Sequence, residues 1–274
     1  MTKTDLHTHT TASDGSLSPS ELTALAAQVG LTCIAITDHD TVKGLRAIKA
    51  LSQPALEIIP GIELSTTFEG RTVHVLGYHI DPGDRALNAF INDRQSRRRL
   101  RAVKILDRLR ALGIDISPDE LPSGSAVGRP HIGSILVKRG ICVSISDAFE
   151  RFLSKGAPAY VPPLSLDARE AISIIHDAHG AAVLAHLNQI GTMEQSGAVC
   201  EALHRSGLDG VECYYSTYDD KWNKFCLSLA AAYGLAATGG SDFHGSRKPD
   251  IKLGELYVPD SVLAPLRQRA QRYK

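Results

Sequence analysis

The stretch Leu31-Thr-Cys-Ile-Ala-Ile-Thr-Asp-His-Asp40 joins a short apolar run, rich in β-branched residues, to three consecutive ionisable side chains. Such a run predicts a buried β-strand, and Asp38, His39 and Asp40 then stand at its carboxyl end. In parallel α/β barrels, that end of each strand carries the functional groups. The stretch therefore predicts an α/β fold and the edge of the sheet at which its chemistry lies.

Strand and helix signals alternate on both sides of this stretch. Ser18-Pro-Ser-Glu21 has the spacing of a capping box with proline at the first helical position, which predicts a helix from there to about Gln28. Alternating strands and helices imply a parallel sheet covered by helices. The further expected elements are a helix at 41–51, strands at Glu57–Ile62 and Thr72–Tyr78, a helix at Asp167–His179, strands at Ala181–Ala185, Gly210–Cys213 and Ala236–Thr238, and a last helix near Val262–Tyr273.

Residues 82–162 interrupt this alternation. Residues 84–112 are typical of one or two long helices, and more helical sequence follows at His131–Arg139 and Ser146–Leu153. We expect a helical insertion over 82–162, set between the two parts of one barrel domain, residues 1–81 and 163–274.

Composition excludes several classes of protein. The chain has 274 residues, and its 43% hydrophobic and 22% charged content is ordinary for a globular fold, which argues against disorder. Its apolar runs are far shorter than the ~20 residues that span a bilayer, and the first residues lack a signal-peptide core. Five scattered cysteines without a Cys-x-x-Cys pair favour reduced thiols. We therefore expect a cytoplasmic protein with no membrane association.

Net charge is zero, with 30 Lys and Arg against 30 Asp and Glu, but the charges are unevenly placed. The segment from Asp93 to Arg110 holds eight basic and two acidic residues, a net charge of +6. The remainder is 22 basic against 28 acidic residues, or −6. Neutrality of the whole chain therefore does not exclude a polyanionic partner.

Histidines and carboxylates recur at the ends of separate predicted strands. His7 and His9 are two residues apart in an extended segment, so both imidazoles point to one side. His74 lies within a predicted strand, where burial is costly unless the group is paired or bound to metal. His79 is its competitor but faces the opposite way in a regular strand. The candidate ligands are His7, His9, Asp14, His39, Glu63, His74, His186, Asp242 and His244.

Each of these residues also has a structural interpretation, such as a turn aspartate or a hydrogen-bonded core histidine. Their joint occurrence at strand ends favours metal binding. Mixed nitrogen and oxygen donors suit Mn²⁺, Zn²⁺ or Fe²⁺, and the absence of nearby cysteine argues against a structural zinc site. Nine ligands are too many for one ion, so we expect two or three ions that share Glu63.

The motifs around His7-x-His9, Asp14, Thr-Asp-His39-Asp, Glu63, His74, Ala-His186 and Ser-Asp242-x-His244 resemble those of the PHP (polymerase and histidinol phosphatase) family. The resemblance covers nearly the whole chain outside the insertion. It implies a distorted (β/α)₇ TIM-like barrel with three metal ions. One ion would take His7, His9, Glu63 and Asp242, a second Glu63, His74 and His186, and the third Asp14, His39 and His244. Leu187 stands where many relatives have proline. This residue is not a ligand, so the difference does not affect the ligand assignment.

The insertion narrows the resemblance. Gly128-Arg-Pro-His131, Tyr160-Val-Pro-Pro163 and the Arg-rich helix are similar to segments of bacterial 3′,5′-nucleotide bisphosphate phosphatases and of the ribonuclease AM type. This implies that Arg129 and His131 hold phosphate; the alternative for His131 is a helix-capping residue. Arg98 and Arg101 share one side of a helix and could grip a second phosphate, or could form a solvated face.

The resemblance implies a phosphatase that removes the 3′-phosphate of nucleoside 3′,5′-bisphosphates, converting pAp to AMP. A hydroxide bridging two of three Mn²⁺ ions would attack phosphorus, with Asp40 or His131 assisting the proton transfers. Short single-stranded RNA, trimmed from its 5′ end, is a second expected substrate, and no obligate protein partner is expected. The alternatives are a histidinol-phosphate phosphatase and a metal-binding module without catalysis.

Overall fold

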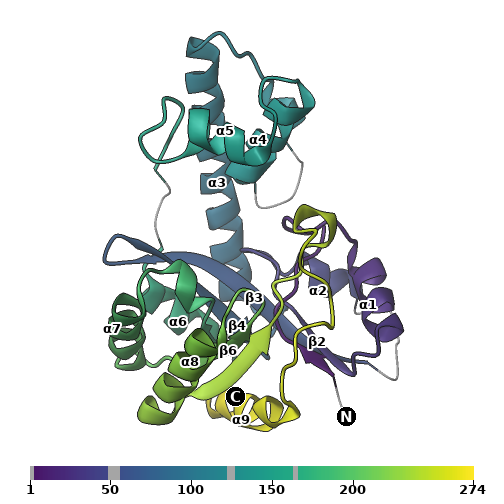
Figure 1. Ribbon diagram of the computed structural model, residues 1–274, viewed down its shortest axis with the longest axis vertical. Helices are drawn as coiled ribbons and strands as arrows, with labels where there is room; N and C mark the ends of the chain where they lie inside the picture. The colour runs from purple at the N-terminus through teal and green to yellow at the C-terminus, as the bar shows by residue number, and fades with distance from the viewer. Residues whose placement is uncertain (1–2, 49–55, 122–126, 163–165) are drawn as a thin grey trace. The chain divides into compact units, whose positions relative to one another are not determined.

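The computed structural model describes residues 3–48, 56–121, 127–162 and 166–274, and the chain divides into two compact units (Figure 1). The barrel unit comprises Met1–Ala89 with Leu166–Lys274, and the insertion unit comprises Phe90–Ser165. The predicted insertion began at residue 82, earlier than Phe90, because the long helix α3 (Arg85–Ala111) begins in the barrel unit and continues into the insertion. Its predicted end at residue 162 lies three residues before Ser165.

Seven strands form the barrel, and each is hydrogen-bonded to the next in chain order. A parallel bridge between Thr8 and Phe243, and a bond from the Leu6 N–H to the Gly239 carbonyl (3.1 Å), bring the first and last strands together. The predicted α/β barrel is therefore confirmed. The strands are β1 (Thr4–Asp5), β2 (Cys33–Ile36), β3 (Glu57–Phe68), β4 (Arg71–Tyr78), β5 (Ala181–Leu184), β6 (Gly210–Tyr215) and β7 (Ala236–Gly240).

The expectation of a wholly parallel sheet was wrong at β4. This strand runs antiparallel to both β3 and β5. A turn of two residues, Glu69 and Gly70, both with positive φ (47° and 79°), joins β3 to β4. So short a connection makes a hairpin, whereas a parallel pair needs a crossover of a dozen residues or more.

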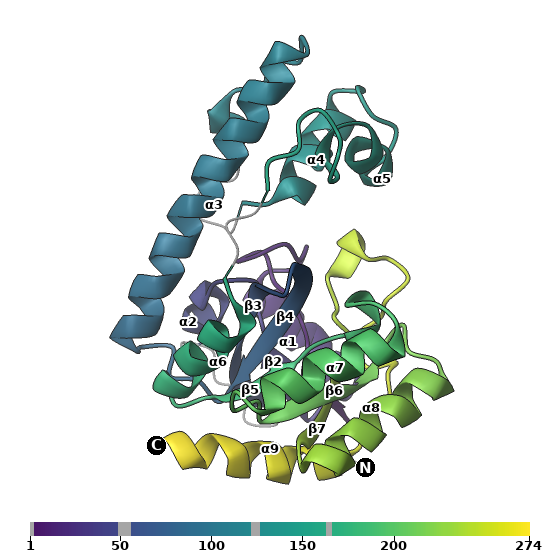
Figure 2. The same cartoon turned by 90° about the vertical axis from the view of Figure 1, so that its left-hand side faces the viewer.

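Helices cover the outside of the barrel, as Figure 2 shows for α7, α8 and α9. The predicted first helix is confirmed: Ser18 caps α1 (Pro19–Gln28), and its backbone N–H donates to Glu21 Oε2 at 2.7 Å. Of the helix expected over 41–51, the described part is α2 (Lys43–Ile48), and residues 49–51 lie outside the described residues. The other helices are α6 (Ala168–Asp177), α7 (Met193–His204), α8 (Asp220–Tyr233) and α9 (Leu263–Ala270).

A buried apolar cluster joins the strands to the segment that carries α9. Tyr78 is fully buried in it and donates its hydroxyl to the Leu6 carbonyl at 2.9 Å. This fixes β4 against the first strand and gives the barrel a rigid base. The cluster contains Leu6, Cys33, Ala35, Ile59, Leu76, Tyr78, Ala181, Val183, Ala185, Val258, Val262, Leu266 and Ala270.

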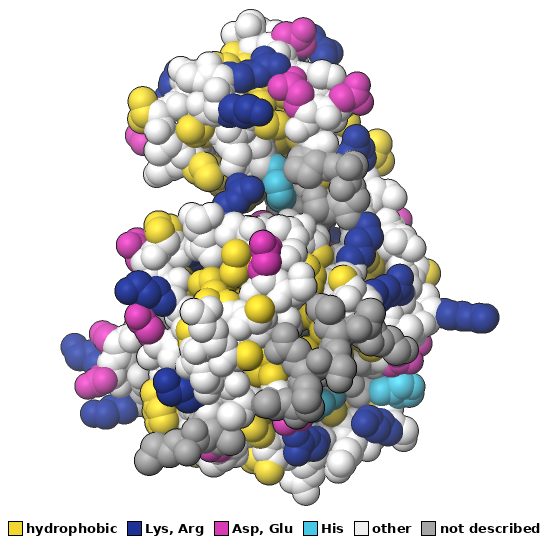
Figure 3. Space-filling view, turned by 90° about the vertical axis from the view of Figure 1, so that its right-hand side faces the viewer, with side chains coloured by type: hydrophobic (Ala, Val, Ile, Leu, Met, Phe, Trp, Pro, Cys, Tyr) yellow, Lys and Arg dark blue, Asp and Glu magenta, His cyan; other side chains and the backbone are white. Residues whose placement is uncertain are grey.

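The insertion unit has a core of its own. The buried residues Ile105, Leu106 and Leu109 of α3 belong to one cluster with Ile132 and Leu136. Its other helices are α4 (Arg129–Lys138) and α5 (Ile145–Ala148), which continues as a π-helix over Phe149–Leu153. On the face of this unit drawn in Figure 3, Lys and Arg side chains lie among hydrophobic ones. Within the described ranges, the structure contains no helix with the length and apolar character of a membrane span.

Candidate metal centre

The nine predicted ligands come together at one end of the barrel, where the chain leaves the strands. The segments after β1 and β7 are tied directly, because the Asp242 N–H donates to the His7 carbonyl (2.8 Å) and the His9 N–H to the Phe243 carbonyl (2.9 Å). His74 reaches the same end from the first half of β4, since this antiparallel strand pairs His74 with Ser65. His79, the competitor of His74, lies beyond β4 and outside the ligand groups.

Glu63 lies in the middle of the predicted ligands. Its side chain is 1% exposed, and its two carboxylate oxygens face five imidazoles. Oε1 lies 2.7 Å from His74 Nδ1 and 3.0 Å from His186 Nε2. Oε2 lies 3.1 Å from His9 Nε2, 3.1 Å from His39 Nδ1 and 3.3 Å from His7 Nε2. One carboxylate can therefore serve ions on both of its sides.

A first group of possible ligands consists of His7, His9, Glu63 and Asp242, all buried, with one ligand atom from each within 4.8 Å of the others. Asp242 Oδ1 lies 3.2 Å from His9 Nε2 and 3.6 Å from His7 Nε2. Its other oxygen, Oδ2, accepts hydrogen bonds from the Tyr215 hydroxyl (2.9 Å) and from Lys248 Nζ (2.6 Å). Asp242 is thus fixed on one side and open toward the histidines on the other.

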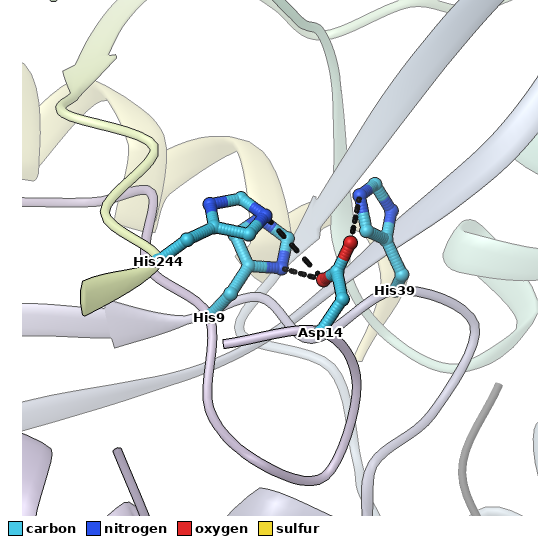
Figure 4. Close-up of side chains that lie close together, drawn as sticks. All are labelled: His9, Asp14, His39 and His244. Atoms are coloured by element: carbon cyan, nitrogen blue, oxygen red, sulfur yellow. Dashed lines mark ion pairs between the residues drawn. The ribbon is translucent and has the colours of Figure 1, made fainter. Parts of the chain in front are cut away.

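A second group surrounds Asp14 at the edge of the centre (Figure 4). Its carboxylate lies 3.4 Å from His244 Nε2, 3.7 Å from His9 Nδ1 and 4.0 Å from His39 Nε2. Asp38 holds the loop that carries Asp14, because its carboxylate accepts hydrogen bonds from the Thr10 N–H and the Ser13 hydroxyl, both at 2.7 Å. The expected set of Asp14, His39 and His244 is therefore brought together, and His9 joins it.

A third group consists of His39, Glu63 and His74. His186, expected here, contacts Glu63 through Nε2, and its own backbone φ is +27°. A positive φ strains the backbone of a residue other than glycine, so the surrounding structure must hold His186 in this conformation. His39 contributes to both the second and the third group, which the sequence did not indicate.

Several buried atoms in this centre form no hydrogen bond of regular geometry, although carboxylate or imidazole atoms lie 3.1–3.4 Å away; among them are His9 Nε2, His39 Nδ1 and Asp14 Oδ1. Leaving such atoms unsatisfied is costly, and lone pairs from imidazoles and carboxylates facing one space are what a divalent cation requires. The donor set therefore fits Mn²⁺, Zn²⁺ or Fe²⁺.

The protonation states agree with this interpretation. Burial alone raises the pKa of the Glu63 carboxyl, but His39, His74 and His7 outweigh it and hold that pKa well below its usual range. Burial lowers the pKa of His39 to about 3. Burial also lowers the pKa of His9, but Asp242 and Glu63 outweigh it and raise that pKa to about 9. A bound cation would take the place of the proton on His9, as metals do when they bind histidine.

The family follows from comparison with known proteins. A model of the PHP domain matches residues 5–234. The chain belongs to the PHP family. It is 35% identical to the 5′-3′ exoribonuclease Rnm of Salmonella typhimurium, over 94% of this chain and 90% of that protein. It is 32% identical to the 3′,5′-nucleoside bisphosphate phosphatase of Chromobacterium violaceum, over 97% of this chain and 95% of that protein.

A solved structure agrees with this membership. A protein of Bifidobacterium adolescentis, assigned as a metal-dependent phosphoesterase, matches with a TM-score of 0.86 and 30% identity over 98% of this chain and 96% of that one. The chain is thus a metal-dependent phosphoesterase of the PHP family, and its cluster of histidines and carboxylates supplies the candidate ligands.

Sequence reasoning missed several polar residues that border the ligands of this PHP centre. Glu212 is fully buried and contacts His7, and Tyr215 and Lys248 both hold Asp242. The available signal was Glu212 itself, an ionisable residue inside the apolar run Gly210–Cys213. Asp40, predicted to assist proton transfer, has φ +47°, and its Oδ1 accepts from the Ser65 N–H at 3.3 Å beside Glu63.

The predicted phosphate-binding residues lie in the insertion unit of the PHP chain. His131 caps α4, since its Nδ1 accepts from the Gly128 N–H at 3.1 Å.

Arg129 donates to the Leu153 carbonyl (3.1 Å), and Arg101 donates from Nε and Nη2 to the Val161 carbonyl (2.9 and 2.8 Å). Burial, with Arg129 and Arg98 nearby, lowers the pKa of Arg101 to about 10. These three arginines therefore lie near one another and share a positive field.

Proposed function

We propose that the chain removes the 3′-phosphate of nucleoside 3′,5′-bisphosphates, with pAp giving AMP, and uses three Mn²⁺ ions. The observation that carries the proposal is the set of three ligand groups linked through Glu63, His9 and His39. The similarity to a nucleoside bisphosphate phosphatase over almost the whole chain supports the substrate class. The five cysteines are free and buried, as is usual in the reducing environment of the cytoplasm, and this supports a cytoplasmic location as part of the proposal.

The proposed ligands are those implied by the family resemblance. His7, His9, Glu63 and Asp242 would hold one ion, and Glu63, His74 and His186 a second. Asp14, His39 and His244 would hold the third. Divalent ions bound there would lower the pKa of a water molecule that they bind to about 7, and they would offset negative charge on phosphoryl oxygens.

The chain's own residues prepare this chemistry. His7 and His9 are fully buried, so the inner part of the centre excludes bulk water and strengthens electrostatic interactions there. Lys248, whose side chain is 37% exposed, holds its ammonium group against Asp242 Oδ2, which places a positive charge beside the centre. Asp40 and His131, the residues predicted to move protons, each accept a hydrogen bond from a backbone N–H group.

The arginines of the insertion are the proposed ligands of the second phosphate. A Cβ atom added to Gly128 would lie 4.0 Å from Arg98 Nη1, so Arg98 stands beside the start of α4. The start of α4 offers few backbone donors, because Pro130 has no N–H and the Gly128 and His131 N–H groups are already bonded, at 3.1 Å each. We therefore assign the second phosphate to the guanidinium groups. The guanidinium groups of Arg101 and Arg129 are held in place by the Val161 and Leu153 carbonyls, to which they donate.

Changing Arg98 to alanine is expected to lower kcat/KM for pAp by roughly 10- to 100-fold, the usual loss for a hydrogen bond to a charged group. Hydrolysis of a substrate with a single phosphate should change little. The matched control is Arg99→Ala, which removes the same charge from the neighbouring, exposed position of α3. Steady-state kinetics on both substrates check this, and equal losses on both would contradict the assignment of Arg98.

A substrate screen tests the proposed function itself. Protein loaded with Mn²⁺ is expected to release phosphate from pAp faster than from histidinol phosphate, in a malachite green assay with metal analysis of the same sample. Short 5′-phosphorylated RNA belongs in the screen, because the chain is 35% identical to an enzyme named 5′-3′ exoribonuclease. Trimming of RNA frees mononucleotides and no inorganic phosphate, so this substrate is followed by chromatography of the released nucleotides. Preference for histidinol phosphate, or the absence of turnover on all three, would contradict the proposal.

A further inference from the structure

Among the seven strands in the described part of the chain, β6 leads to none of the nine proposed ligands. It nevertheless places a carboxylate inside the centre: Glu212 is 0% exposed. An ionised carboxylate is retained at such a position only when it is well paired. The partners of Glu212 therefore indicate its role.

Glu212 contacts two of the proposed ligands from two different strands. Its Oε1 lies 2.9 Å from His7 Nδ1, and its Oε2 accepts a hydrogen bond from the His186 backbone N–H at 2.7 Å. The first contact keeps the proton of His7 on Nδ1 and leaves Nε2 to face Glu63 and Asp242. The second holds His186 at its strained φ of +27°.

A bulge in β6 brings a second side chain to the same face. Glu212 pairs with Thr238 and Tyr214 with Gly239, so β6 advances two residues where β7 advances one. The extra residue reverses the alternation of side chains, and Tyr215 then points to the same side as Glu212. A Cβ atom on Gly239 would lie 2.5 Å from Tyr214 Cβ, so the bulge requires glycine opposite it.

Tyr215 uses this position to hold a third proposed ligand. Its hydroxyl donates to Asp242 Oδ2 at 2.9 Å, and its side chain is 2% exposed. Asp242 has φ +58°, so it too is held in a strained conformation. Glu212 and Tyr215 thus contact ligands that follow β1, β5 and β7.

We propose that β6 is the positioning strand of the metal centre, in which Glu212 orients His7 and His186 and Tyr215 orients Asp242 for metal binding. The inference rests on the ligand assignment proposed above. Neither Glu212 nor Tyr215 is a ligand in that assignment. Both act by holding residues that are ligands.

The same strand offers a matched control at its other end. Asp209 directly precedes β6, is 2% exposed, and bonds a histidine ring and a backbone N–H just as Glu212 does. Its Oδ2 lies 2.8 Å from His176 Nε2 and accepts from the Ala182 N–H at 2.9 Å. Asp209 touches none of the proposed ligands, so a purely structural role of such a carboxylate is measured by Asp209→Asn.

The experiment titrates metal-free protein with Mn²⁺ by calorimetry and records the visible spectrum of the Co²⁺-loaded form. Glu212→Gln keeps the size of the side chain but replaces one acceptor oxygen with a donor, which would face the His186 N–H or the His7 ring. We expect Mn²⁺ affinity to fall by about 10- to 100-fold and the Co²⁺ spectrum to change. Asp209→Asn should alter neither. Tyr215→Phe, which removes only a hydroxyl, should weaken Mn²⁺ binding and provides the test if Glu212→Gln does not fold.

The outcomes separate this inference from the ligand assignment. Wild-type protein that binds no Mn²⁺ would contradict both. Normal Mn²⁺ binding by the wild type together with unchanged affinity and spectrum in Glu212→Gln, or in Tyr215→Phe where that variant provides the test, would overturn the role of β6 alone. An equal loss in Asp209→Asn would overturn it as well, because the effect would then follow from loss of any buried carboxylate on or beside this strand.

Discussion

Replacing Glu63 with glutamine is expected to lower phosphoester hydrolysis by roughly 10³-fold or more while the protein remains folded, since metal centres supply several kcal/mol of transition-state stabilisation. Both oxygens of Glu63 face imidazoles, and the residue belongs to two of the three ligand groups. Glutamine offers one neutral acceptor oxygen in place of two charged ones. Metal content by mass spectrometry of the purified variant should fall together with activity.

The matched control lies on the same strand. Glu57 begins β3 and pairs with Arg267 Nη2 at 2.6 Å, with both side chains about half exposed. Exposed ion pairs contribute little, about 0–1 kcal/mol, so Glu57→Gln should retain activity and metal. A Glu63→Gln protein with near wild-type turnover would show that hydrolysis does not depend on this centre.

Much of the barrel could be predicted because its signals are local. The capping box at Ser18 acts through contacts within one turn, and it was found from four residues. The apolar run ending in Asp38-His39-Asp40 marks a strand end by itself. Most of the nine candidate ligands were found for the same reason, since they are ionisable residues at or near the end of an apolar segment. His74 instead lies inside such a segment, and Asp14 lies in a turn that by itself favours a structural aspartate.

The rest could not be predicted because it depends on pairing between distant segments. The antiparallel direction of β4 follows from a turn of two residues that has no strong sequence signal beyond Glu69-Gly70. The sharing of His39 between two ligand groups depends on the distance between strand ends. The role of Glu212 depends on the bulge opposite Gly239, which is a property of two strands together. For Arg101, the regular helix spacing was evident, but its bond to Val161, 60 residues away, was not.

Removal of Asp14 is expected to cost one metal ion and to reduce turnover by roughly 10²-fold, less than the loss for Glu63, because only part of the transition-state stabilisation is withdrawn. Asp14 belongs to one ligand group only, with His9, His39 and His244, and its side chain is 28% exposed at the edge of the centre (Figure 4). Changing His39 would be less specific, since His39 also faces Glu63 at 3.1 Å. Asp14→Ala therefore isolates the third ion.

Alanine is preferred to asparagine at this position because Gly15 follows, and an Asn-Gly pair deamidates readily and would restore the carboxylate. The control is Asp81→Ala, which also removes a turn carboxylate: Asp81 Oδ1 accepts from the Gly83 N–H at 2.8 Å, beyond the last residue of β4. Because β4 runs antiparallel, that turn lies at the opposite end of the barrel from His74. Metal counting and kinetics on the same samples decide the matter. Loss of all bound metal in Asp14→Ala would mean that the three groups form one cooperative site, and an unchanged ion count would mean that Asp14 holds none.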